Sequence, residues 1–247
     1  MPIHDWTRAG SGAFHDFHSA WIIELRNALN AGLLSPAYYA MAEQVAGDFI
    51  PDVLALQESA VGPGTADQEK PAGALAVLEA PPKVSLTESV ELDRYALLNK
   101  ELVIRHSSGD RIVALVEIVS SGNKSSAYAV KVFVEKALAA FSKGINVLVV
   151  DLYPPGPFDP HGIYGAIWSQ IKNDAYRVPT GKPLTLSAYS ASNDVTSYVE
   201  PAAVGSRLID MRLFLKPGWY VNIPLETTYM AAFKGVPLRW RRVIEGS

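Results

Sequence analysis

Residues 111–124 read RIVALVEIVSSGNK, and this stretch decides the fold. Its apolar run, rich in β-branched residues, is typical of a strand that is buried on both faces. Glu117 is the one charged residue within residues 112–119, and a buried carboxylate without a partner is costly. We therefore expect a lysine, a metal ion or a shared proton beside Glu117, and a polar site where this strand ends.

The residues that follow predict a helix and a second buried strand. Residues 126–143 have helical periodicity, with Tyr128, Val132, Phe133 and Lys136 on one predicted face, and Gly144 stands where a helix cap belongs. Residues 145–152 are again apolar and end before a proline-rich turn. A strand, a helix and a strand in this order form a right-handed crossover in the expected case, so the core is predicted to be α/β.

The rest of the chain is predicted to complete a single α/β domain. At 247 residues the length suits one large domain, and we find no internal repeat. The predicted parts are an N-terminal helix at 14–31, a mobile loop at about 59–82, a core of 36–58 and 99–152, and a C-terminal β-rich extension at 155–247. Within the core, residues 107–110 are predicted to be a hairpin turn.

Composition limits the classes of function. The chain is 49% hydrophobic and 19% charged, as in an ordinary soluble globular protein, and its net charge of -3 lacks the basic excess of most nucleic-acid binders. There is no cysteine, so a metal would need His, Asp or Glu ligands. No apolar stretch reaches the ~18 residues of a membrane span, and the start does not resemble a signal peptide, so we expect a cytoplasmic protein without a membrane partner.

Three residues around the predicted crossover suggest hydrolytic chemistry. Asp52 follows a proline at the start of one predicted strand, Glu117 lies late in another, and Lys136 points inward from the helix. Two carboxylates on neighbouring strands can hold a divalent cation through oxygen ligands. An ammonium nearby can orient an attacking water or stabilise charge on a phosphoryl oxygen. This set suits hydrolysis of a phosphodiester.

These residues also carry a resemblance. The chain resembles a bacterial family, domain-of-unknown-function family 4058, which is similar to the Uma-type proteins of the PD-(D/E)XK nuclease superfamily. The matching stretches are Phe14 to His18, Tyr38 to Ala40, Pro51 to Val53, Val116 to Ser120 with Asn123 and Lys124, Phe133 to Lys136 with Gly144 and Asp151, and Leu215 to Tyr229. The resemblance implies a restriction-endonuclease-like mixed sheet flanked by helices.

The resemblance also assigns roles to individual residues. It makes Asp52 and Glu117 the ligands of Mg²⁺ or Mn²⁺, and Glu43 a further upstream acid. The usual Glu-x-Lys pattern would place its lysine at position 119, where this chain has Val119. The lysine role therefore falls to Lys136, moved onto the adjacent helix, or to Lys124.

Two further groups of polar residues have competing interpretations. Ser120, Asn123 and Lys124 precede a helix, where backbone N–H groups could bind an anionic substrate. The alternative is an ordinary turn with Ser125 or Ser126 as the helix cap. His15 and His18 lie one helical turn apart and His4 is close in sequence, so a metal site is geometrically allowed. Structural histidines bonded within the core are the favoured alternative.

The function predicted from the sequence is therefore metal-dependent phosphodiester hydrolysis, with nucleic acid or another phosphodiester as the partner. The alternative is a non-catalytic binding or scaffolding module, in which Glu117 and Lys136 persist only as a buried ion pair. The substrate and the oligomeric state are not indicated by the sequence.

Overall fold

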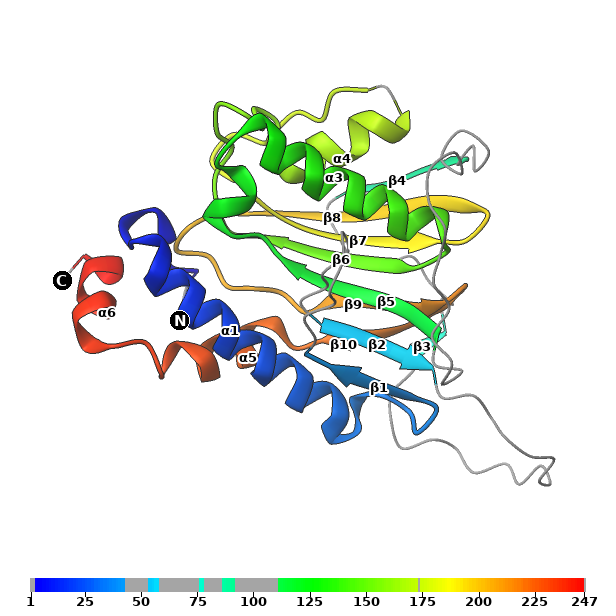
Figure 1. Ribbon diagram of the computed structural model, residues 1–247, viewed down its shortest axis with the longest axis horizontal. Coiled ribbons are helices and arrows are strands. Elements are labelled where there is room, and N and C mark those ends of the chain that lie inside the picture. The colour runs from blue at the N-terminus through cyan, green and yellow to red at the C-terminus, as the bar shows by residue number, and fades with distance from the viewer. Residues whose placement is uncertain are drawn as a thin grey trace.

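The computed structural model describes residues 3–42, 111–172 and 174–246, and the backbone alone of 53–57, 76–77 and 86–91. These residues form an α/β structure in three layers, with a large mixed sheet in the middle (Figure 1). Helices α3 and α4 cover one face of this sheet. A smaller sheet and helices α1 and α5 cover the other face.

The larger sheet has seven described strands. Its spatial order is β1 (Tyr38–Met41), β2 (Val53–Gln57), β5 (Arg111–Ile118), β6 (Asn146–Asp151), β7 (Leu184–Ala191), β8 (Asp194–Ala202) and β4 (Leu86–Glu91). Strands β5 and β6 are parallel, and the other described neighbours in this sheet are antiparallel. The carboxyl ends of β5 and β6 therefore lie at the same edge.

The predicted crossover is confirmed by helix α3 (Ala127–Ser142), which connects β5 to β6. The Ser126 side chain accepts a hydrogen bond from the Ala129 amide and caps the helix, and Gly144 follows with a φ of 70° that suits glycine. The prediction was wrong for two residues of the inward face. Tyr128 is 77% exposed and Val132 is 40% exposed, because the buried stripe of α3 lies one residue further round the helix.

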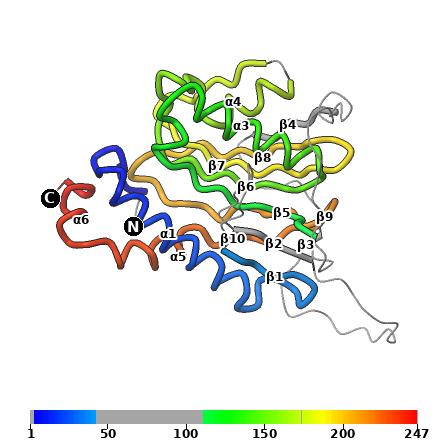
Figure 2. The backbone as a smooth tube through the Cα atoms, viewed as in Figure 1, coloured from blue at the N-terminus to red at the C-terminus, as the bar shows by residue number. Residues whose placement is uncertain are grey.

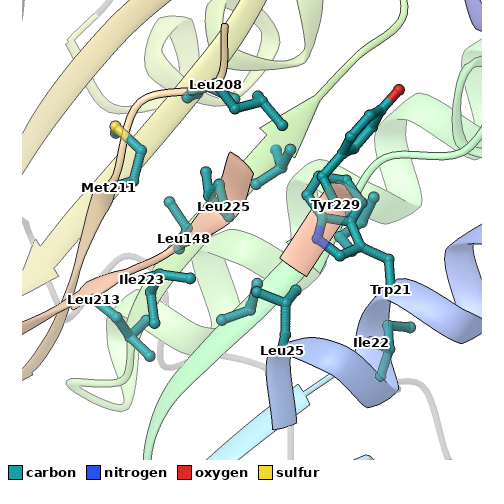
Figure 3. Packing of buried hydrophobic residues seen from close by; sticks show 14 of the residues in the cluster. Trp21, Ile22, Leu25, Leu148, Leu208, Met211, Leu213, Ile223, Leu225 and Tyr229 are labelled. Atoms are coloured by element: carbon teal, nitrogen blue, oxygen red, sulfur yellow. The ribbon is translucent and has the colours of Figure 1, made fainter. Parts of the chain in front are cut away.

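The opposite face of the sheet is covered by elements from both ends of the chain. These are α1 (Ser11–Ala28) with a wider last turn at Leu29–Leu33, and the C-terminal β9 (Met211–Lys216), β10 (Trp219–Ile223) and α5 (Leu225–Phe233). Figure 3 shows Trp21 of α1 packed against Tyr229 of α5, and Leu148 of β6 beside Leu225 and Ile223. Aromatic side chains fill much of this contact, and Trp6 and Trp21 share this core with Tyr229 and Phe233 from the other end of the chain.

The predicted C-terminal β-rich extension is divided between two sheets. Strands β7 and β8 continue the larger sheet directly from β6, so they belong to the central layer. Strands β9 and β10 form the smaller sheet with β3 (Ala76–Val77). This region also contains two helices, α4 (Gly162–Lys172) and α6 (Leu238–Glu245). The predicted loop at 59–82 was wrong for residues 76–77, which form β3 and pair with β10. The rest of that predicted loop and the predicted hairpin turn at 107–110 lie outside the described residues.

Candidate functional site at the ends of β5 and β6

Glu117 and Lys136 form an ion pair between the sheet and α3. The Lys136 Nζ atom lies 2.7 Å from Glu117 Oε1, and the Glu117 residue is only 5% exposed. The lysine predicted as the compensating group is therefore the one found beside the buried carboxylate. Breaking such a pair by removing one partner typically costs about 3–5 kcal/mol, because the other charge stays buried.

The register of the sheet orients Glu117 toward α3. Val116 and Ile118 belong to the core on the α1 side, whereas Leu115 and Val119 pack in the core beneath α3 and α4. Side chains alternate between the faces of a strand, so Glu117 shares the α3 side. A small hollow adjoins the ion pair and has room for about one water molecule. Its walls are Leu115, Phe133, Ala137, Val147 and Val149, together with the two charged residues.

The other two predicted acids, Asp52 and Glu43, lie outside the described residues. The nearest described neighbour of Asp52 in the chain is Val53, and Val53 pairs with Val116, the residue before Glu117. In the described part of the chain, no three His, Asp or Glu side chains gather in a way that could hold a metal ion.

A second buried ionic cluster joins Lys124 to two aspartates. The Lys124 Nζ atom lies 2.9 Å from Asp151 Oδ2 and 2.9 Å from Asp159 Oδ2, and it donates to the Tyr153 carbonyl oxygen at 2.8 Å. Asp151 and the Tyr153 carbonyl oxygen accept hydrogen bonds from this ammonium, whereas Asp159 Oδ2 lies within ion-pair distance without a hydrogen bond of good geometry. Lys124 was predicted as a possible anion contact, and its ammonium is instead directed into the protein.

The same cluster holds the turn that follows β6. Asp151 also accepts hydrogen bonds from the amides of Tyr153 and Ile163, and Asp159 accepts one from the amide of Gly156. Burial raises the pKa of Asp151, and the Lys124 ammonium opposes that rise. Because Asp151 lies two residues beyond Val149, the register partner of Glu117, both acids face the same side of the sheet. Asp151 is the last residue of β6.

Ser120 and Asn123 close the turn between β5 and α3. The Ser120 amide and hydroxyl both lie 2.8 Å from Asn123 Oδ1, and the Asn123 amide donates to the Ser120 carbonyl oxygen. This arrangement agrees with the interpretation of the segment as an ordinary turn, in which Ser126 caps the helix. An anionic substrate at these residues stays a prediction.

The three N-terminal histidines lie in different environments. His4 is buried, with its Nδ1 atom 2.7 Å from the Tyr229 hydroxyl oxygen and its ring stacked on Phe233 at 3.8 Å. Burial lowers the pKa of His4. His15 is exposed, and its ring centroid lies 6.4 Å from that of His18. His4 thus has a structural role, and sequence spacing did not reveal its partner Tyr229, which is 225 positions away.

Comparisons with known proteins add no relative: no family model matches the chain, and neither a curated protein nor a solved structure matches it. Among the described residues, no helix has the length and apolar character to cross a bilayer.

Proposed function

We propose that the protein is a metal-dependent phosphodiester hydrolase with a restriction-endonuclease-like fold. The observation that carries the proposal is the Glu117–Lys136 pair, held 2.7 Å apart within a buried sheet beside a water-sized hollow. A carboxylate and an ammonium in a site of low dielectric constant act more strongly on a reacting group than they would in water. The mixed sheet flanked by helices agrees with the proposed fold.

In this proposal each residue has a separate role. Glu117 and Asp52 hold Mg²⁺ or Mn²⁺, and Glu43 is an auxiliary acid. A divalent ion would supply polarisation of the phosphoryl group and a more acidic water. Lys136 would position the attacking water or stabilise the developing negative charge. Glu117 suits an oxygen-preferring cation, and the pairing of Val53 with Val116 supports Asp52 as its companion.

The closed geometry of the pair supports a second candidate, a non-catalytic module that keeps Glu117 and Lys136 as a structural ion pair. Loss of stability in single variants does not separate the two candidates, because each predicts a penalty for an orphaned buried charge. The discriminating variant is Glu117→Gln combined with Lys136→Met, which removes both charges together and is expected to fold.

The test measures hydrolysis of DNA, RNA and bis-p-nitrophenyl phosphate with Mn²⁺ and with EDTA, alongside thermal unfolding. The proposal expects Mn²⁺-dependent hydrolysis by the native protein, a higher melting temperature with Mn²⁺, and loss of both effects in the double variant. The matched control is Glu135→Gln, which alters an exposed acid on α3 paired with Lys131 at 3.7 Å. Hydrolysis that persists in the double variant, or is missing from the native protein on all three substrates, refutes the proposal.

A further inference from the structure

Helix α6 presents a cationic face that the proposed catalytic pair does not use. The sequence from 239 to 242 is Arg-Trp-Arg-Arg, three cations in four residues of a chain with a net charge of -3. Arg239 and Arg242 are exposed, and they lie one turn apart on the same side of α6. The helix is anchored from its other side, where Ile244 is buried and Trp240 packs against the core.

The neighbours of this face leave the guanidinium N–H groups of the two arginines available to a partner, and the Arg239 Cζ atom lies 5.3 Å from the centre of the Trp240 ring. Glu245 is the nearest acid along α6, and its Oε1 atom lies 3.9 Å from His4 Nε2. Arg241 donates to the Val236 carbonyl oxygen at 2.7 Å and so belongs to the fold. Within the described residues no carboxylate pairs with Arg239 or Arg242. Like charges one turn apart repel, and an anion between them would relieve that repulsion.

The position of α6 relates this face to the strand ends. Figures 1 and 2 show α6 beyond the start of α1, at the end of the molecule toward which β5 and β6 point. Packing contacts connect the two places. The tip of the Trp240 ring approaches Gly10 just before α1, and Phe14 of α1 meets Tyr153 after β6 with ring centroids 5.0 Å apart.

We infer that Arg239 and Arg242 form a docking surface for the phosphate backbone of a nucleic acid. Guanidinium groups bind phosphate oxygens through paired hydrogen bonds, and successive phosphates of one strand could engage the two arginines in turn. This inference deepens the proposed function by naming its partner. Exposed Leu238 and Val243 flank the arginines. An anionic membrane is the less favoured partner, because an interfacial helix needs a broad apolar face and α6 has cations at the centre of its exposed face.

The experiment measures binding of the full chain to a short fluorescent DNA duplex by anisotropy, in EDTA and at KCl concentrations from about 50 to about 200 mM. EDTA excludes metal-dependent hydrolysis, so binding is tested apart from catalysis. Arg239→Gln combined with Arg242→Gln is compared with a charge-matched control, Lys143→Gln combined with Lys172→Gln. The control lysines follow or end α3 and α4 at the opposite end of the sheet (Figure 1).

Each phosphate contact contributes about 0.9 to the slope of log affinity against log salt, so the arginine variant is expected to lower that slope by about 2. The control is expected to keep the native slope. If the two arginines only stabilise the end of α6, their replacement would change the melting temperature without changing the slope of log affinity against log salt. An unchanged slope in the arginine variant, or no duplex binding by the native protein, overturns the inference. Binding to phosphatidylserine vesicles in place of DNA, lost in the arginine variant, overturns it in favour of a lipid partner. Arginine-dependent binding without hydrolysis upholds the inference and refutes only the proposed function.

Discussion

Replacing Tyr229 by phenylalanine is expected to destabilise the protein strongly, although it removes a single oxygen atom. The Tyr229 hydroxyl oxygen lies 3.2 Å from the His4 amide nitrogen and 3.1 Å from Trp6 Nε1, and both of these groups can only donate. The hydroxyl proton is then directed to His4 Nδ1, 2.7 Å away. Burial raises the pKa of Tyr229, so this proton is retained at neutral pH.

The expected magnitude follows from the groups left without partners. The variant orphans two buried donors and one buried acceptor, and each such group costs about 1–3 kcal/mol. A loss of at least about 3 kcal/mol is therefore expected, which is a large share of the ~5–15 kcal/mol that stabilises a typical domain. Tyr189→Phe is the matched control. Tyr189 is equally buried, and its hydroxyl lies beside Ser187 without a hydrogen bond of good geometry in the described structure.

The measurement is urea unfolding at pH 7.5, followed by tryptophan fluorescence, for the native protein and both variants. Tyr189→Phe is expected to change the free energy of unfolding by less than about 0.5 kcal/mol, because it removes a hydroxyl that has no such bond to lose. Equal m-values would show that the unfolded states are comparable. A cost below about 1 kcal/mol for Tyr229→Phe, or an equal cost for the two variants, would refute this account of the network.

Three further predictions concern other buried groups. Lys124→Met leaves two buried aspartates without their cation and is expected to cost about 3–5 kcal/mol in urea unfolding, whereas Lys131→Met in an exposed pair should cost under about 1 kcal/mol. Burial lowers the pKa of His4 below the 6.5 of the unfolded chain, so the unfolded state takes up more protons and stability falls as the pH drops below about 6.5. His4→Asn should flatten that dependence between pH 7 and 5, and an unchanged slope would contradict it. Gly165→Ala would place a methyl group 2.5 Å from a neighbouring Cβ atom and should lower the melting temperature, with a cost of about 1–3 kcal/mol, whereas Gly12→Ala meets nothing within 4 Å and should be neutral or stabilising.

The crossover could be predicted from sequence because its signals are local. The apolar run before Glu117 and the helical period after it each determine one element, and β5, α3 and β6 begin and end within two residues of the predicted bounds. The assignment of β7 and β8 to the central sheet could not be predicted in this way. Strand pairing depends on contacts between distant segments, and an alternating pattern does not identify the neighbouring strand.

The Lys124 cluster was missed for a related reason. Lys124, Asp151 and Asp159 each lie next to residues that are typical of turns. From the sequence alone, each can therefore be interpreted as a capping residue or as a charge exposed to solvent. Their meeting depends on the path of the chain after β6, where the Gly156 amide binds Asp159 and turns that carboxylate toward Lys124. The Ser120 to Lys124 motif resembles an anion-binding turn in sequence. In the folded chain, however, Lys124 of this motif forms ion pairs with the carboxylates of Asp151 and Asp159.

The position of Lys136 on α3 explains why the ion pair could be predicted although the helix face was partly wrong. Phe133, Ala137 and Ala140 lie on the buried stripe, while Lys136 lies at its margin and its side chain is 15% exposed. A lysine there can lay its aliphatic stem along the apolar surface and still bring its ammonium to Glu117. This margin is also where a charged group can meet both the sheet and solvent, which catalysis requires and a purely structural pair does not. The hydrolase and the non-catalytic module are therefore distinguished by one measurement, which is whether metal-dependent hydrolysis is lost when the charges of Glu117 and Lys136 are both removed.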